Sequence, residues 1–312
     1  MGATPPSPRI AVAPAGVLSW LDDAVREGGG EVVPVAEATG LVWAAFDRPR
    51  QLAAVLADHP HLDWVQLPWA GVENFRSMID HERRWTCAKG VYADPVAEHA
   101  LGLLLAGRRG LAAYARRTTF DRRDGNDLGH NLFDSRVVVL GGGGIAEALL
   151  RLLAPFRADV TVVRRTPQPM EGAARVVGHD ALDLVLPDAD AVVLALAATP
   201  DSVGIIGRDQ LALFGPHTWL VNVARGQHVD TDALVEALTS GAIGGAALDV
   251  VDPEPLPDGH PLWSLRNCLI TPHVGNTEAM ARPLLAARVT ENVRRYRRGE
   301  ALAGPVDPDL GY

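Results

Sequence analysis

The chain has 312 residues, enough for two domains with sizeable cores, and its 47% hydrophobic and 21% charged residues are typical of a globular protein. Its net charge of −9 argues against a nucleic-acid-binding surface, and no apolar run approaches the roughly 20 residues of a membrane span. Only Cys87 and Cys268 occur, far apart, which supports neither a disulfide framework nor a structural zinc. We therefore expect a cytoplasmic protein whose partners are neither nucleic acids nor membranes.

The first hundred residues alternate short β-like runs with helical patterns. Strands are expected at 9–13, 31–35, 41–44, 64–67 and 85–88, with helices at 17–27 and 50–59. Strands that alternate with helices pair in parallel through crossovers. A doubly wound α/β layer is the expected fold class of this first lobe.

A second α/β series begins after an apolar helix expected from Val96 to about Tyr114 and a polar stretch at 118–130. Its six expected strands lie at 137–140, 160–163, 191–196, 218–223, 245–249 and 268–271. Six is the number in a full dinucleotide-binding sheet. A last helix is expected at 277–298, closed by Gly299 and free to return to the first lobe.

The turn after the first strand of this series carries four consecutive glycines, Gly141 to Gly144. An apolar strand enters the turn, and a helical pattern leaves it. Gly141, Gly143 and Ala146 fit G-x-G-x-x-[G/A], in which the backbone approaches a pyrophosphate at a helix N-terminus. Because strand, glycines and helix occur in this order, the pattern predicts a dinucleotide site rather than an ordinary β–α corner.

The end of the next strand predicts which dinucleotide is preferred. NAD-binding domains commonly carry an acid there, which binds the ribose 2′-hydroxyl. This strand instead ends in Arg164, followed by Arg165 and Thr166, and Asp159 lies at its opposite end. Two cations and a hydroxyl suit a 2′-phosphate, so we expect NADPH to be preferred, with NAD a possible alternative.

Three chemistry-bearing side chains follow three separate strands of the second series. Arg225, Glu254 and His273 should therefore meet at the carboxyl edge of the sheet, where open α/β sheets bind ligands. Reduction of an α-keto acid needs these groups beside a nicotinamide, because the substrate anion must be held and its carbonyl oxygen protonated. Asp252 is an alternative carboxylate partner for the histidine. His217, His228 and His260 lack partners at ligand spacing, so no metal site is expected.

Motifs along nearly the whole chain resemble those of D-isomer-specific 2-hydroxyacid dehydrogenases. They are Ala70-Gly-Val-Glu-Asn74, Pro95-Val-Ala-Glu-His99, Gly141–Ala146, Thr199-Pro200, Asn222–Asp230, Leu248–Pro255, Pro261-Leu-Trp263 and Thr271-Pro-His273. The resemblance implies that His273 is the acid/base, Glu254 its partner and Arg225 the substrate clamp. It implies that the amides of Ala70, Gly71 and Val72 hold the substrate carboxylate. The cofactor-binding residues expected are Gly141, Gly143, Gly144, Ile145, Arg164, Arg165, Thr166, Thr199, Ala224 and Asp249, the last at the nicotinamide carboxamide.

The resemblance also implies a domain arrangement: a Rossmann dinucleotide-binding domain at 101–284 inserted into a flavodoxin-like substrate (lid) domain at 1–100 and 285–312. The expected activity is reduction of a small 2-oxo acid, glyoxylate or hydroxypyruvate, to the D-2-hydroxy acid with NAD(P)H. A non-catalytic dinucleotide-sensing regulator is the alternative. A formate dehydrogenase is disfavoured, since that family pairs its histidine with glutamine. Relatives dimerise through the helix from Val96 and the 118–130 arm, so a homodimer is expected.

Overall fold

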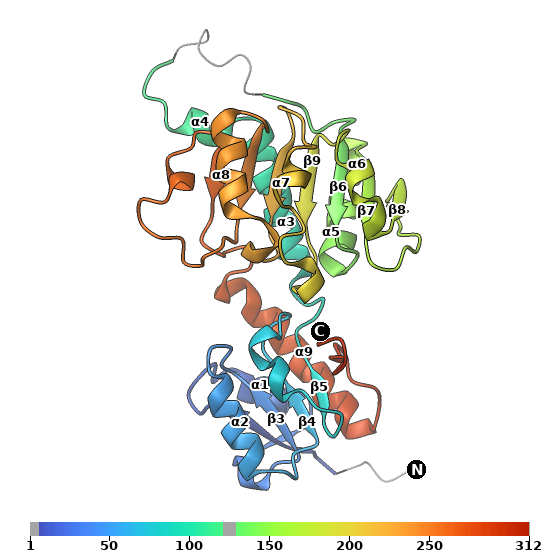
Figure 1. Cartoon of the computed structure of the whole chain (residues 1–312). Coiled ribbons are helices and arrows are strands. Elements are labelled where there is room, and N and C mark those ends of the chain that lie inside the picture. The colour runs from blue at the N-terminus through green and yellow to red at the C-terminus, as the bar shows by residue number, and fades with distance from the viewer. Residues whose placement is uncertain (1–5, 121–128, 312) are drawn as a thin grey trace. The chain divides into compact units, whose positions relative to one another are not determined.

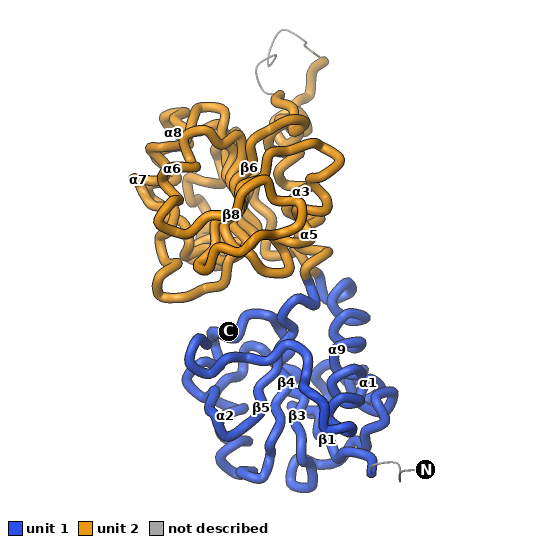
Figure 2. Tube along the Cα trace, turned by 90° about the vertical axis from the view of Figure 1, so that its right-hand side faces the viewer, with its two compact units in different colours: residues 1–92, 277–312 blue, residues 93–276 orange. Residues whose placement is uncertain are grey.

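The structure, a computed structural model, describes residues 6–120 and 129–311. The chain divides into two compact units, Met1–Tyr92 with Thr277–Tyr312 (unit 1) and Ala93–Asn276 (unit 2) (Figures 1 and 2). Unit 2 is therefore inserted within the sequence of unit 1. Both boundaries come earlier than the expected 100/101 and 284/285. They fall where helices α3 (Ala93–Arg108) and α9 (Glu278–Arg298) begin, so that each helix belongs whole to one unit.

Unit 1 is built on a five-stranded sheet in the order β2-β1-β3-β4-β5, which is the flavodoxin-like order. All of its ladders are parallel. Its strands are β1 (Arg9–Ala13), β2 (Glu31–Val32), β3 (Gly40–Trp43), β4 (Trp64–Gln66) and β5 (Arg84–Thr86), and its first helices are α1 (Leu21–Glu27) and α2 (Pro49–Asp58). The strand expected at 31–35 is shorter because Pro34 has no amide hydrogen to donate to a ladder.

Helix α9 completes unit 1, so the expected return of the C-terminal helix to the first lobe is confirmed. Thr290 Oγ1 donates to the Ala24 carbonyl at 3.0 Å, and Asn292 Nδ2 donates to Gln66 Oε1 at 2.8 Å. The helix ends at Gly299, whose φ of +68° is the left-handed conformation that glycine adopts without strain.

Unit 2 contains a seven-stranded sheet in the order β12-β11-β10-β9-β6-β7-β8, again with parallel ladders. Its strands are β6 (Arg136–Leu140), β7 (Asp159–Val163), β8 (Arg175–Val177), β9 (Ala191–Leu194), β10 (Trp219–Asn222), β11 (Gly245–Leu248) and β12 (Cys268–Ile270). The prediction of six strands was wrong because β8 is a three-residue edge strand that offers too few residues for a pattern. With β8 included, the strands after β6 run outward on both sides of it, as in a Rossmann fold.

Helices cover both faces of this sheet, and each face has its own core. One core joins α3 and α5 to the sheet and includes Leu104, Leu149 and Val193. The other includes Leu182, Leu211 and Leu234, which lie on the helices of the opposite face. The remaining helices are α4 (Leu111–Ala115), α5 (Gly144–Leu153), α6 (Leu182–Val185), α7 (Arg208–Leu211) and α8 (Thr231–Ser240).

The single helix expected from Val96 to about Tyr114 is instead two helices. Helix α3 ends at Arg108, and α4 starts at Leu111 after Gly110, whose φ is +62°. A left-handed residue cannot continue a right-handed helix. Arg108 also anchors the end of α3, because its buried guanidinium donates to the carbonyls of Asn131 and Asp190 at 2.6 and 2.7 Å.

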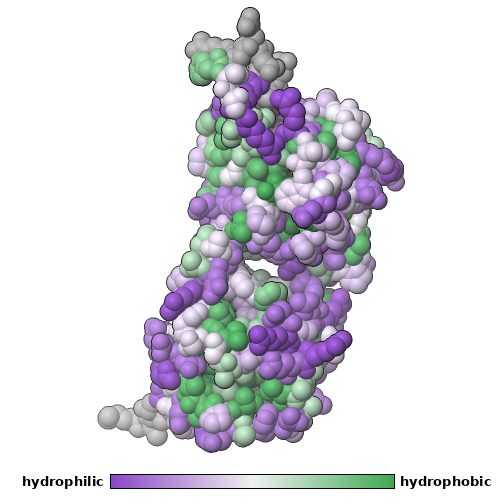
Figure 3. Space-filling view, turned by 90° about the vertical axis from the view of Figure 1, so that its left-hand side faces the viewer, coloured by the Kyte–Doolittle hydropathy of each residue, from purple (hydrophilic) through white to green (hydrophobic). Residues whose placement is uncertain are grey.

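On the face drawn in Figure 3, hydrophobic residues lie in separate groups among hydrophilic ones on both units. Across residues 6–120 and 129–311, no helix combines the length and the apolar character needed to cross a membrane.

Two glycines of α3 give opposite predictions for alanine substitution. A Cβ at Gly107 would lie 2.3 Å from Cε3 of Trp219, whereas one at exposed Gly102 would meet nothing within 4 Å. Gly107→Ala should lower the free energy of unfolding by about 1–3 kcal/mol through overpacking. Gly102→Ala, the matched control, should raise it by up to about 1 kcal/mol through helix propensity. Urea denaturation measures both, and equal shifts would contradict the assigned packing.

Candidate active site

The glycine turn joins β6 to α5 at the point where the sheet order reverses. Gly141 has a φ of +112°, and a Cβ there would lie 2.3 Å from the carbonyl oxygen of Ala195, which follows β9. A side chain at Gly143 would meet nothing within 4 Å, so the turn is open on that side. No side chain caps the N-terminus of α5, which starts at Gly144 and continues with Ile145. The turn therefore presents bare backbone and a helix N-terminus, as anion binding requires.

Arg164 lies beside this turn. It follows β7, and its amide donates to the Val177 carbonyl at 3.0 Å, so its backbone extends the β7–β8 ladder. A Cβ at Gly142 would lie 2.8 Å from both Cδ and Nε of Arg164, which places the Arg164 side chain against the glycine backbone. Arg165 and Thr166 are exposed just beyond it. The loop after β7 thus brings positive charge beside the glycine turn.

Arg225 stands in a tight turn after β10 that Asn222 holds. The side chain of buried Asn222 donates to the Arg225 carbonyl at 2.8 Å and accepts from the Ala224 amide at 3.0 Å. Gly226 is required there, because a Cβ would lie 1.9 Å from the Val251 carbonyl oxygen. Sequence reasoning gave Asn222 no role, although a buried amide at a strand end is a signal of such a turn.

His273 and Glu254 form a direct pair. Nδ1 of His273 lies 2.7 Å from Oε1 of Glu254, and the two side chains are about half exposed, at 51% and 43%. Glu254 rather than Asp252 makes this contact, and the Asp252 carbonyl instead accepts from Thr231. Because a carboxylate on Nδ1 fixes the tautomer, Nε2 is left to exchange a proton with a ligand.

The segment that carries His273 is anchored by the buried carboxylate of Asp249. Oδ1 accepts from Thr271 Oγ1 at 2.6 Å and from the Val274 amide at 2.9 Å, while Oδ2 accepts from the Gly275 amide at 2.9 Å. Burial raises the pKa of Asp249, but hydrogen bonds from His99, Thr271 and the two amides outweigh it, and the pKa falls to about 2. The carboxylate thus stays charged and holds the loop.

His99 reaches this anchor from α3. Its Nε2 lies 3.0 Å from Thr271 Oγ1 and 3.2 Å from Asp249 Oδ1. In the sequence, His99 stood out only as the end of the Pro95-Val-Ala-Glu-His99 motif. The structure shows that it links α3 to the loop after β12, a role that only the long-range contacts disclose. His273 itself adopts φ +53°, and its amide donates to the Asp249 carbonyl at 2.8 Å.

Thr199 and Ala224 lie on the loops after β9 and β10. Thr199 caps a short 3-10 helix, with its amide donating to Ser202 Oγ at 2.9 Å. Ala224 is buried in the core, and its carbonyl accepts from Arg225 Nη1 at 2.7 Å. Both residues therefore lie at the carboxyl edge of the sheet, with their amides engaged in local hydrogen bonds.

In unit 1, the loop after β4 carries Ala70, Gly71 and Val72. Within the described part of the chain, the amides of these three residues have no hydrogen-bond acceptor. Val72 is 2% exposed and anchors the loop, whereas Ala70 is exposed. These three amides are therefore available to donate hydrogen bonds to an anion.

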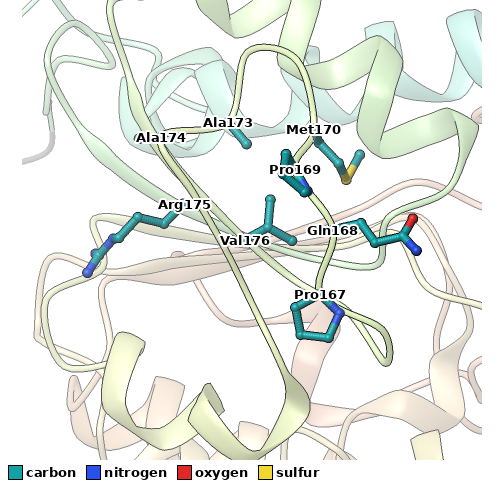
Figure 4. A pocket seen from close by; sticks show the side chains of 8 residues that line it. All are labelled: Pro167, Gln168, Pro169, Met170, Ala173, Ala174, Arg175 and Val176. Carbon is teal, nitrogen blue, oxygen red and sulfur yellow. The ribbon is translucent and has the colours of Figure 1, made fainter.

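Two surface pockets lie outside these groups. One, of ≈ 270 Å³, is formed by the segment 167–176 that leads into β8, and Figure 4 shows Arg175 pointing away from its other lining residues. The second, of ≈ 420 Å³, includes Asp230, Asp252 and His260. Neither lining includes Arg225, Glu254 or His273. Among the described residues, no group of His, Cys, Asp and Glu side chains could hold a metal ion.

The lowered pKa of Asp249 predicts a pH-dependent contribution to stability. A carboxyl group whose pKa is lower in the folded state than in the unfolded state stabilises the protein at pH values above its unfolded-state pKa. This contribution is lost as the pH falls through the folded-state pKa. Asp249→Asn should therefore be less stable than wild type at pH 7, and this difference should shrink by about 2 kcal/mol between about pH 5 and 2. Urea denaturation across this range measures the difference. Asp201→Asn, at an exposed carboxylate, is the control, and a pH-independent difference for Asp249→Asn would contradict the prediction.

Comparison with known proteins identifies the family. A family model described as D-isomer specific 2-hydroxyacid dehydrogenase, NAD binding domain, matches residues 101–275. A Corynebacterium melassecola protein from the proB 3′ region is 39% identical over 93% of this chain and 95% of its own length. Glyoxylate reductase/hydroxypyruvate reductase of Mus musculus is 32% identical over 68% of this chain and 66% of its own.

A solved structure gives the same result. The D-isomer specific 2-hydroxyacid dehydrogenase of Xanthobacter autotrophicus Py2, in complex with NADPH and MES, has a TM-score of 0.82 at 29% identity, covering 98% of this chain and 100% of that chain. The resemblance seen in the sequence motifs is thus confirmed by an independent comparison of folds. The chain belongs to the D-isomer specific 2-hydroxyacid dehydrogenase family.

Proposed function

We propose that this protein reduces a small 2-oxo acid to the D-2-hydroxy acid with NADPH, and that glyoxylate and hydroxypyruvate are the first substrates to test. The observation that carries the proposal is the 2.7 Å contact between His273 and Glu254, on loops that leave the same sheet edge as Arg225. The Mus musculus relative is named for both substrates. A regulator that only senses dinucleotides does not need a histidine–carboxylate pair for proton transfer. Formate oxidation is disfavoured because formate dehydrogenases pair their histidine with glutamine, whereas the partner here is Glu254.

His273 is proposed as the acid that protonates the substrate's carbonyl oxygen. Glu254 accepts a hydrogen bond from Nδ1–H and stabilises the protonated imidazole, so that Nε2–H can be donated. The bound dinucleotide supplies the hydride to the carbonyl carbon. In the reverse direction, the same Nε2 accepts the proton of the hydroxyl group.

Arg225 is proposed to hold and polarise the substrate. Its planar guanidinium offers several donors, which suit a carboxylate or a carbonyl oxygen. The turn around Asn222 fixes the backbone from which this side chain extends. The amides of Ala70, Gly71 and Val72 are proposed to bind the substrate carboxylate.

The dinucleotide is proposed to bind along the carboxyl edge of the unit 2 sheet. Gly141, Gly143, Gly144 and Ile145 would receive the pyrophosphate, while Arg164, Arg165 and Thr166 would contact the 2′-phosphate. The open side of Gly143 and the placement of Arg164 against Gly142 fit these roles. Thr199 and Ala224 would contact it from the loops after β9 and β10. Asp249 Oδ2 has one contact in the loop, the Gly275 amide, and so retains capacity for the nicotinamide carboxamide.

A homodimer is proposed as well. Within α3, Leu103 and Leu104 are buried in the core of unit 2 and are therefore not accessible to a partner subunit. The exposed Leu111, Tyr114 and Phe120 are instead the apolar side chains that a partner would cover. Residues 121–128 of the expected 118–130 arm lie outside the described residues. Light scattering separates a dimer from a monomer.

Substitution of His273 tests the catalytic assignment. His273→Gln should lower kcat for glyoxylate or hydroxypyruvate reduction by about 10²–10⁴-fold, because general acid catalysis is lost. NADPH affinity, measured by calorimetry, should hardly change. His81→Gln, which removes another exposed histidine–carboxylate pair (His81–Asp309, 3.2 Å), is the control and should retain wild-type kcat. A kcat of His273→Gln close to that of wild type would contradict the assignment of His273 as the general acid.

Substitution of Arg164 tests the cofactor preference. Arg164→Ala should reduce the ratio of kcat/KM with NADPH to that with NADH by roughly one to two decades, since a charge-assisted contact to the 2′-phosphate is lost. The control is Arg175→Ala, because this arginine lies near the same segment but at the start of β8. A wild-type protein that prefers NADH, or an unchanged ratio in Arg164→Ala, would show that another residue selects the cofactor.

A further inference from the structure

Three aromatic rings gather at the carboxyl ends of three neighbouring strands in unit 1. Phe46 follows β3, Trp69 follows β4 and Tyr92 follows β5. The rings of Phe46 and Trp69 meet edge to face with centroids 6.1 Å apart, and those of Trp69 and Tyr92 lie 5.4 Å apart. The cluster is therefore continuous from a buried ring, Tyr92 at 6% exposed, to an accessible one, Phe46 at 53%.

Two polar side chains at the cluster form hydrogen bonds within the protein. The Tyr92 hydroxyl donates to the Pro68 carbonyl at 2.8 Å, and Asn74 Nδ2 donates to the Phe46 carbonyl at 3.3 Å. These bonds fix the rings to the loop after β4. Phe46 thus differs from an isolated surface phenylalanine, because its backbone and its ring are both held in place.

The same loop carries the proposed anion site. Trp69 directly precedes Ala70, the first of the three amides without an acceptor in the described chain, and Asn74 comes two residues after the last, Val72. One short segment therefore fixes both the amides and the accessible aromatic ring. In a 2-oxo acid, the carboxylate and the variable substituent are separated only by the carbonyl carbon. A substrate held through its carboxylate here has its substituent within reach of a ring.

We propose that Phe46, backed by Trp69, is a specificity-determining residue that contacts the substituent on the carbonyl carbon of the 2-oxo acid. The phenyl ring of Phe46 favours alkyl and aryl substituents over hydroxymethyl or carboxymethyl ones, because a polar group packed against this ring loses its hydration and finds no hydrogen-bonding atom on it. Each methylene group of the substrate that is buried against Phe46 and Trp69 should raise kcat/KM about fourfold. This inference rests on the proposed function, and it ranks hydroxypyruvate below pyruvate among the 2-oxo acids that the protein would reduce.

The experiment compares kcat/KM across two series of 2-oxo acids, each normalised to glyoxylate, which has no substituent. The apolar series is pyruvate, 2-oxobutyrate, 2-oxopentanoate and phenylpyruvate, and the polar series is hydroxypyruvate and oxaloacetate. Wild type should show a rise along the apolar series and prefer pyruvate to hydroxypyruvate. Phe46→Ala should flatten this rise, mainly through KM, and Phe46→Leu should restore most of it. Phe133→Ala, at an exposed ring in unit 2, is the control and should keep the wild-type series.

The outcomes separate this inference from the function on which it rests. The inference alone would be overturned if glyoxylate is reduced and kcat/KM varies along the apolar series in the same way in wild type and in Phe46→Ala. Preference of the wild type for hydroxypyruvate over pyruvate would also overturn it alone. If none of the 2-oxo acids is reduced although NADPH binds, the proposed function fails, and the inference fails with it.

Discussion

Every ladder in both sheets is parallel, and the location of the candidate site residues follows from this constraint. Parallel strands end at one edge, so the loops that follow them are delivered together. In unit 2 this edge receives the glycine turn, Arg164, Arg225, Glu254 and His273. In unit 1 it receives the three amides and the aromatic cluster. Within each unit, the strand order alone therefore brings residues that are distant in sequence to the same edge of the sheet.

Strand order alone does not orient a side chain, and buried polar groups supply that orientation. Asp249 gathers two backbone amides and the Thr271 hydroxyl, while His99 ties the same carboxylate to α3. Burying a carboxylate is costly unless it is fully hydrogen-bonded, and here the bonds outweigh the burial. The loop bearing His273 is thereby held against the sheet although the His273 side chain is half exposed.

Close backbone approach places the remaining groups. Gly141 lets the loops after β6 and β9 touch, Gly142 accommodates the Arg164 side chain, and Gly226 lets the Arg225 turn pass against Val251. At each position a Cβ would collide with a neighbour far away in the sequence. These glycines thus set distances between loops, whereas Gly143 leaves open space where a dinucleotide is proposed to lie.

Much of this arrangement could be predicted from periodicity and motifs. Apolar runs between helical patterns gave the α/β class and most strand positions, because burial on both faces of a parallel sheet leaves a strong local signal. Strand ends predicted the residues of the candidate site. The edge strand β8 was missed because three residues are too few to show the alternation of a strand. The helix break at Gly110 was missed because a glycine within a helical pattern does not by itself indicate a left-handed conformation.

Residue order along the chain thus specifies the local features, namely the alternation of elements, the glycine turn, the absence of an acid after β7 and the residues at strand ends. The folded arrangement was needed to show that Glu254 rather than Asp252 contacts His273, that His99 joins Asp249 and Thr271, and that the ring of Phe46 contacts that of Trp69. These contacts join segments that are far apart in the chain. In the case of Glu254 and Asp252, the two candidate residues lie only two positions apart in the same loop. Their geometry depends on how whole elements pack, and no local pattern of residue types records it.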